Sequence, residues 1–177
     1  PKIAISGRLS INLIMMIYFV SGICSLIDEV IWVRLFKLIL GNTVYASSIV
    51  VSVFLGGLAL GALIMGRYCD CVKRHLRLYA LLESLVTISA LSLPWILKLV
   101  DPLYVWFYQR YHPSQVYLLI VQAVISAAIL LVPSMLMGST LPLLGRFVTS
   151  IESEAGHLVG RLYALNTLGA AAGCFLA

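Results

Sequence analysis

The stretch that decides the fold is residues 56–83, GGLALGALIMGRYCDCVKRHLRLYALLE, which joins two apolar runs through a basic turn. Residues 43–66 contain no charged side chain, and a helix of about 20 apolar residues crosses a bilayer core about 30 Å thick. The turn that follows carries one acid, Asp70, against four bases, Arg67, Lys73, Arg74 and Arg77. Because Lys and Arg are enriched in cytoplasmic loops, this stretch predicts a membrane span and its orientation.

Composition extends this prediction to the whole chain. Of the 177 residues, 62% are hydrophobic and only 11% are charged, and the mean hydropathy is +1.04. A soluble fold of this composition would lack the polar groups to cover its surface. The apolar runs have helical length and lack the alternation of barrel strands. We therefore expect an all-α, polytopic transmembrane helical bundle in a single domain.

The apolar runs predict five spans, and a sixth is expected beyond Ala177. Their approximate bounds are 10–30, 43–66, 78–97, 116–147 and 158–177. The fourth run is too long for one straight span, and we expect a kink or break near Pro133 and Gly138, because a proline removes a backbone hydrogen bond. Gly41 and Asn42 predict the turn into the second span.

The segment after the first span has two interpretations. Residues 31–42 contain Trp32, with Arg34 and Lys37 on one face, which is typical of an amphipathic helix lying at the membrane interface. Asp28 and Glu29 would then mark the far interface. Alternatively, the first helix extends and holds Glu29 toward the bundle interior, where a carboxylate can bind a cation or a proton.

Charge counting gives the topology. Eight bases fall on one side of the predicted spans, Lys2, Arg8, Arg67, Lys73, Arg74, Arg77, Arg146 and Arg161. Four fall on the other, Arg34, Lys37, Lys98 and Arg110. This asymmetry predicts a multi-pass protein with a cytoplasmic N terminus and a cytoplasmic loop from Arg67 to Arg77. The net charge of +5 then reflects topology and anionic headgroups, and we expect the lipid bilayer, not nucleic acid, as the partner.

Few polar residues lie within the spans. Glu83 either reaches back to Arg77 or Arg74, or lines a polar cavity with Asn166 or Gln122. We take Glu29, Glu83, Asn166 and Gln122 as candidate residues for binding a solute or cation. The four cysteines and His112 lack the spacing of metal ligands, and no catalytic constellation is evident, so we expect no metal, no cofactor and no intrinsic catalysis.

Small residues predict where helices pack closely. Gly57 and Gly61 form one GxxxG pair, and Gly169 and Gly173 form another. Such pairs allow two helix backbones to approach in lipid, where no hydrophobic drive brings helices together. We therefore expect both pairs to pack against neighbouring spans.

Several motifs resemble known membrane proteins. Gly66, Asp70 and Arg74 match the G-x-x-x-D-x-x-x-R frame of the loop between the second and third helices of major-facilitator-type transporters, and the chain departs from that loop at Cys71 and Lys73. A series of ordered motifs resembles the membrane domain of bacterial spermidine-synthase-like proteins: SGICSLIDEVIWVRLFKLILGNTVYASS, FLGGLALGALIMGRYCD, LRLYALLE, VPSMLMGSTLPLLGR and GRLYALNTLGAAAG. The chain departs from the pattern of that family at Asp28, Cys69 and Cys71.

This resemblance implies one lobe of a major-facilitator-type fold in the bacterial inner membrane. It also implies that any aminopropyltransferase chemistry belongs to a soluble synthase-like domain outside this chain, linked to it or held in a larger complex. One hypothesis is transport or channelling of a polyamine or related cationic solute, with Glu29 and Glu83 as acid partners. The other is a non-catalytic assembly subunit that docks onto a larger membrane complex through small-residue helix faces.

Overall fold

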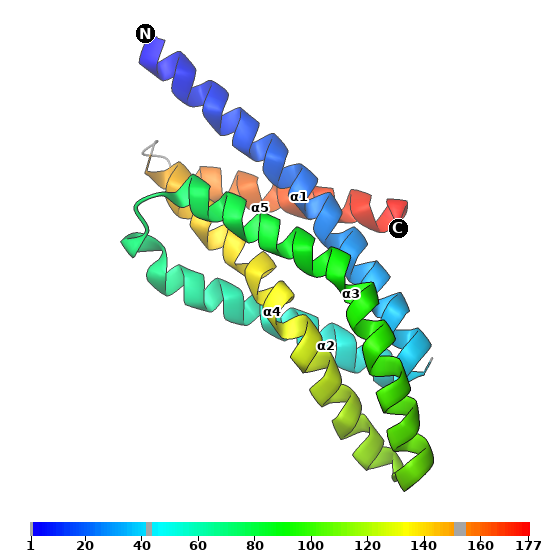
Figure 1. Ribbon diagram of the computed structural model, residues 1–177. Helices are drawn as coiled ribbons and strands as arrows, with labels where there is room; N and C mark the ends of the chain where they lie inside the picture. Colours follow the sequence, from blue (N-terminus) through cyan, green and yellow to red (C-terminus); the bar gives the residue numbers. More distant parts are fainter. Residues whose placement is uncertain (1, 42–43, 151–154) are drawn as a thin grey trace.

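The described part of the chain is built from helices. The computed structural model describes residues 2–41, 44–150 and 155–177, and no strand occurs among them. In chain order the elements are α1 (Lys2–Leu40), α2 (Val44–Tyr68), the short 3-10 helix η1 (Cys69–Cys71), α3 (His75–Tyr111), α4 (Gln115–Thr149) and α5 (Ala155–Leu176) (Figure 1). The prediction of an all-α fold is confirmed.

Four of these helices are long and apolar enough to cross a membrane. Their candidate spans are Ile11–Leu40, Val44–Cys71, His75–Tyr111 and Gln115–Thr149. The predicted fifth span, 158–177, falls in α5, which is not among them and whose apolar run is interrupted by Arg161 and Asn166. Many large apolar side chains lie exposed on the surfaces of the helices. Water-soluble proteins rarely expose wide apolar areas. These faces suit contact with lipid.

Residues 31–40 do not form a separate interfacial helix. They continue α1, which ends at Leu40 before a turn at Gly41 with φ of 96°. Trp32, Phe36 and Leu40 follow one another at four-residue spacing, so they share a face, and all three are buried in a core with Phe54 of α2. This packing is the physical reason that α1 extends. Asn42, predicted to share the turn, lies outside the described residues.

Glycines bring α2 and α4 into backbone contact. A methyl group built on Gly61 would collide with the backbone of Met135, and one on Gly138 would collide with the backbone of Leu58. Ser139 Oγ donates a hydrogen bond to the Gly61 carbonyl oxygen at 3.2 Å. The crossing therefore depends on the absence of side chains at these glycines.

The crossing of α1 with α5 is built in the same way. Methyl groups on Gly169 and Gly173 would collide with the backbone of α1 at Phe19 and Ile23. A methyl group on Gly22 would collide with the backbone of Asn166. Each crossing thus pairs a GxxxG face on one helix with a single glycine on its partner.

Helix α4 is continuous, although it contains Pro133 and Pro142. Of the kink or break expected near Pro133 and Gly138, a break is therefore absent. Nearby hydroxyl groups bond within the helix: Ser134 Oγ donates to the Leu130 carbonyl at 2.7 Å, and Thr140 Oγ1 donates to the Met137 carbonyl at 2.7 Å. These are not the carbonyls four residues before each proline, which lose their N–H partner. The close packing of α4 on α2 fits its continuity.

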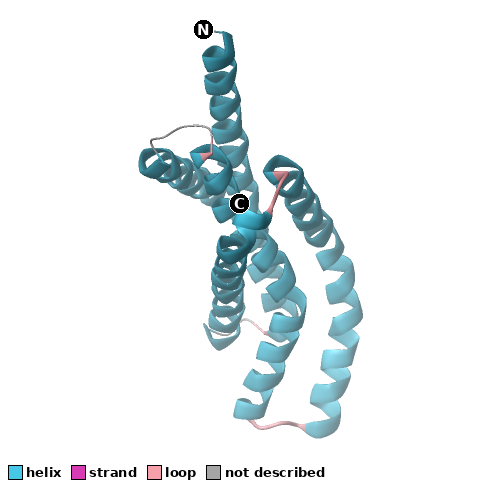
Figure 2. Ribbon diagram, turned by 90° about the vertical axis from the view of Figure 1, so that its left-hand side faces the viewer, coloured by secondary structure: helices cyan, strands magenta, loops and turns pink. Residues whose placement is uncertain are grey.

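The ends of the helices define two ends of the bundle. The α2–α3 turn and the carboxyl end of α4 lie together at one end, while the carboxyl end of α1, the start of α2 and the α3–α4 hairpin lie toward the other (Figure 1). The first turns of α1 and the α3–α4 hairpin extend past the other helices in opposite directions (Figure 2). The segments that carry Arg67, Lys73, Arg74, Arg77 and Arg146 therefore lie at the first end.

Candidate functional site

A groove between α1 and α3 contains the candidate residue Glu83. Its volume is about 700 Å³, and most of its lining is aliphatic, from residues such as Leu13, Ile17 and Leu76. The polar atoms come from Ser21, Cys24, Tyr79, Glu83 and Thr87. An apolar cavity with a few convergent polar groups is the usual form of a small-molecule site.

Glu83 is held in the groove by α1. Ser21 Oγ donates a hydrogen bond to Glu83 Oε1 at 2.7 Å, and the side chain of Glu83 is partly buried. Arg77 precedes Glu83 by six residues and Arg74 by nine, so at 3.6 residues per turn both start from other faces of α3. Neither arginine forms an ion pair with Glu83, and the described residues give this carboxylate no basic partner. The alternative in which Glu83 is neutralised by the basic turn is therefore not seen.

Tyr79 lies one turn before Glu83 on the same face of α3. Its side chain is 8% exposed, and its hydroxyl group has no hydrogen-bond partner among the described residues. Its ring meets the ring of Tyr18 on α1 edge to face, with 6.5 Å between centroids. The Tyr18 hydroxyl in turn lies 3.5 Å from Thr140 Oγ1 of α4. Through Tyr18, Tyr79 in the wall of the groove is thus connected to Thr140 of α4.

Sequence reasoning missed Tyr79 and Tyr18 as members of this site. The spacing of Tyr79 and Glu83, four residues apart, places both on one helix face and was available in the sequence. Which helix that face meets was not available. The contact with α1 is what joins Ser21 and Tyr18 to them.

Asp28 and Glu29 lie further along α1. Leu40 is level with Gln122 of α4, to which its carbonyl is bonded, and Glu29 precedes Leu40 by about 17 Å at 1.5 Å per residue. In a bilayer core about 30 Å thick, the two acids thus lie near mid-depth if Leu40 is at the far boundary. Both are partly buried, and neither has an ion pair or hydrogen bond to the described residues. The extended-helix interpretation fits this placement better than the interfacial one.

Gln122 and Asn166 lie away from the Glu83 carboxylate. Gln122 is buried, and its Nε2 donates to the Leu40 carbonyl at 2.8 Å and to the Tyr104 hydroxyl at 3.0 Å. It therefore joins α1, α3 and α4 near the far end of the bundle. Asn166 lies on α5 against Gly22, the residue next to Ser21. The structure brings neither amide to Glu83.

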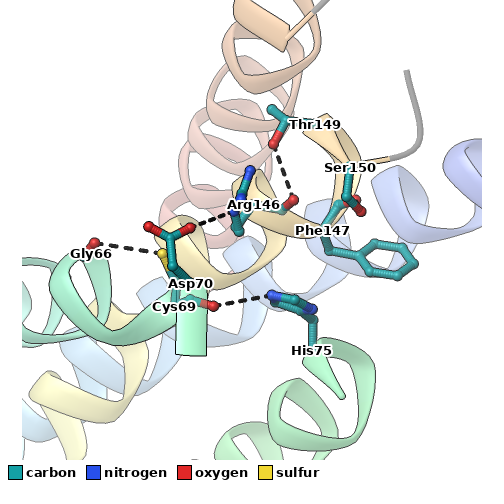
Figure 3. Close-up of polar contacts among 8 residues, drawn as sticks. All are labelled: Gly66, Cys69, Asp70, His75, Arg146, Phe147, Thr149 and Ser150. Carbon is teal, nitrogen blue, oxygen red and sulfur yellow. Dashed lines mark hydrogen bonds and ion pairs between the residues drawn. The ribbon is translucent and has the colours of Figure 1, made fainter. Parts of the chain in front are cut away.

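The predicted cytoplasmic turn docks on the carboxyl end of α4 (Figure 3). Asp70 forms an ion pair with Arg146, with 2.6 Å between Asp70 Oδ1 and Arg146 Nε. His75 Nε2 hydrogen bonds to the Cys69 carbonyl at 3.2 Å, and its ring lies 6.3 Å from that of Phe147. The turn and α4 are thus connected by one charged contact and one ring contact.

The three residues of the transporter-like loop frame differ in their surroundings. Asp70 forms the ion pair just described, whereas Arg74 is exposed at the start of α3. A methyl group on Gly66 would meet open space, so packing does not require glycine there. Within the described ranges, no three His, Cys, Asp or Glu side chains gather as metal ligands would.

Comparisons with protein families, with curated proteins and with solved structures found no match to this chain.

Proposed function

We propose that this chain is the membrane domain of a spermidine-synthase-like protein, and that it binds a polyamine or a related organic cation in the α1–α3 groove. The observation that carries the proposal is the Glu83 carboxylate, which lies in an apolar groove without a basic partner among the described residues. A carboxylate within a membrane span is costly and marks a functional site by default. An alkylammonium group would neutralise it.

The shape and chemistry of the groove support an amine with an apolar stem. Its volume, about 700 Å³, lies within the range of roughly 300–1,000 Å³ typical of small-molecule sites. Aliphatic residues from α1 and α3 would contact the methylene groups of the solute. Ser21 already orients one carboxylate oxygen, which leaves the other free to accept a hydrogen bond from an ammonium group.

The proposed orientation places the N terminus and the Arg67–Arg77 loop in the cytoplasm of a bacterial cell, in the inner membrane. The Asp70–Arg146 contact supports it, because it joins two segments that charge counting assigned to one side. Glu83 lies on the first turns of α3, near this basic end. The groove would then be reached from the cytoplasmic half of the membrane.

Binding of radiolabelled spermidine to the protein in lipid nanodiscs tests the proposal. Glu83→Gln keeps the size of the side chain and removes its charge. Loss of one charge-assisted hydrogen bond, about 1.5–3 kcal/mol, predicts affinity lower by roughly 10-fold to 150-fold. Asp101→Asn is the matched control, since it removes an acid from an exposed position on the same helix. Equal affinities in all three proteins, or no binding at all, would refute the proposal.

Uptake into liposomes separates transport from binding alone. A transporter or channel predicts spermidine accumulation that falls in Glu83→Gln and not in Asp101→Asn. Binding without uptake would leave the domain as a site that holds the amine for a linked synthase-like domain.

One observation favours the second candidate, a non-catalytic assembly subunit. Asp28 and Glu29 lie within a span without a described partner, and a basic residue on a helix of a larger complex would neutralise them. This alternative predicts that Glu29→Gln releases a co-purifying membrane protein and leaves spermidine binding unchanged.

A further inference from the structure

We infer that the α1–α3 groove selects a primary monoamine with an apolar tail, and that it binds such an amine more tightly than a polyamine. The inference rests on the proposed function and narrows the ligand of the same groove to one charged group at the end of an aliphatic chain. Three features carry it: the number of acids in the groove, a buried hydroxyl group beside the acid, and the residues that follow along α1 and α3.

The groove offers one acid to a bound amine. Among the described residues that line it, Glu83 is the one carboxylate, and none is basic. A polyamine carries two or more ammonium groups, and only one of them can pair with Glu83. The next group would lie against aliphatic side chains, where an unpaired charge is costly to bury. The charge of the groove therefore matches a ligand with a single ammonium group.

The polar part of the groove has hydrogen-bond acceptors for an N–H donor. Ser21 donates to one carboxylate oxygen of Glu83, so the other oxygen is open to a ligand. The hydroxyl of Tyr79, one turn away on the same helix face, is buried without a partner among the described residues, and its oxygen can accept. A primary ammonium group has three N–H donors and can meet both acceptors, whereas a trimethylammonium group has none. We therefore expect the head of the ligand to be a primary amine.

The rest of the groove suits an aliphatic tail. Its lining includes Leu13 and Ile17, which precede Ser21 on α1, and Leu76, which precedes Glu83 on α3. Leu76 lies two helical turns before Glu83, which is about 10 Å along the helix at 1.5 Å per residue. A hexyl chain bound at Glu83 fits within this length. Its methylene groups would contact apolar side chains throughout.

Positive charge follows this aliphatic section. Leu76 is next to Arg77, and Arg74 precedes it at the start of α3, and both arginines are exposed. The acid of the neighbouring turn, Asp70, is already paired with Arg146. A second ammonium group that reached past Leu76 would therefore approach like charges, which repel it. A polyamine thus meets aliphatic residues and then bases, and neither neutralises its remaining charges.

Calorimetry with matched amines tests the inference. Hexylamine, 1,6-diaminohexane, hexyltrimethylammonium and spermidine are titrated at pH 7 into the protein in nanodiscs, and empty nanodiscs correct for partition into lipid. Primary alkylammonium groups, like the Lys side chain, are charged at this pH. We expect hexylamine to bind roughly 10-fold or more tightly than each of the others, because each of them either leaves a charge unpaired or lacks N–H donors.

Variants assign this selectivity to residues. Tyr79→Phe keeps the ring that packs on Tyr18, and it should weaken hexylamine by roughly 10-fold and leave hexyltrimethylammonium unchanged. Leu76→Glu adds a second acid two turns from the first, so it should strengthen 1,6-diaminohexane far more than hexylamine. Leu76→Gln is its matched control, with the same size and no charge. A gain of diamine affinity cannot result from misfolding, so this variant remains informative if Tyr79→Phe is unstable.

Three results would overturn the inference while the proposed function stands. One is binding of spermidine or 1,6-diaminohexane as tight as that of hexylamine. Another is equal affinity for hexylamine and hexyltrimethylammonium. The third is a preference for hexylamine that Leu76→Glu leaves unchanged. If none of the four amines binds the parent protein, the proposed function itself fails, and the inference with it.

Discussion

Replacement of Gly61 by alanine should destabilise the protein, whereas the same change at Gly56 should not. Both glycines lie within α2, so replacement by alanine improves the helix propensity by about 1 kcal/mol at either position. A methyl group on Gly61 would overlap the Met135 backbone of α4, while one on Gly56 would meet nothing within 4 Å. The difference between the two variants therefore isolates the cost of separating α2 from α4.

The magnitude follows from what the methyl group meets. Overpacking usually costs about 1–3 kcal/mol, and the upper half of this range applies because backbone atoms cannot rotate away as a side chain can. The shift would also weaken the hydrogen bond from Ser139 to the Gly61 carbonyl. At about 2–4 °C per kcal/mol for a domain of this size, Gly61→Ala should melt about 5–10 °C below Gly56→Ala.

Circular dichroism at 222 nm during heating, in one detergent and at one protein concentration, measures both variants. Gly66→Ala is a second control, since its methyl group would also meet open space on the same helix. If Gly61→Ala melts within 1–2 °C of these controls, α2 and α4 do not form a close backbone contact at Gly61.

Three further changes test other contacts. Gly169→Ala should lower the melting temperature relative to Gly160→Ala, because the first methyl group would collide with the α1 backbone and the second would meet open space; the same heating experiment compares them. Asp70→Asn should cost less than about 1 kcal/mol, because its ion pair with Arg146 is half exposed, with side-chain exposures of 68% and 50%. A double-mutant cycle in low and high salt measures that coupling, and a large value independent of salt would contradict it. Gln122→Leu should cost about 1–3 kcal/mol by leaving a buried carbonyl at the end of α1 unpaired, and chemical denaturation that finds this variant as stable as the parent would exclude that role.

The sequence was sufficient to predict the class of the fold. An apolar run such as residues 43–66 allows little besides a membrane helix, because a backbone in lipid must satisfy its own hydrogen bonds. The GxxxG spacing also identified four glycines that lie at helix crossings. It did not identify their partners, since Gly22 and Gly138 are single glycines and carry no spacing signal of their own.

Length and continuity of helices were harder to predict. The segment after Glu29 contains Arg34 and Lys37, whose charge favoured an interfacial helix, and extension of the first helix was the alternative. Its buried face, from Trp32 to Leu40, outweighed that charge because it packs on neighbouring helices. Similarly, Pro133 predicted a kink or a break in α4, and the structure excludes the break, because the helix is continuous where it packs on α2.

The candidate site could be predicted only in part. Glu83 was identifiable as an acid inside a span, but the sequence analysis left contact with Arg77 or Arg74 open, and the structure shows no such ion pair among the described residues. Its contact with Ser21 joins residues 62 positions apart, and such a contact depends on how α1 crosses α3. Helical periodicity specifies which residues share a face, and it leaves open which face of another helix they meet.

The most direct test of a cation site in the groove uses Cys24, a native cysteine that lies exposed in its wall. In a variant with the other three cysteines changed to serine, the rate at which a small maleimide labels Cys24 is measured with and without spermidine. We expect spermidine to slow this labelling, and Glu83→Gln to remove the protection. Labelling that spermidine does not change, or that it slows equally in Glu83→Gln, would exclude a cation site at Glu83.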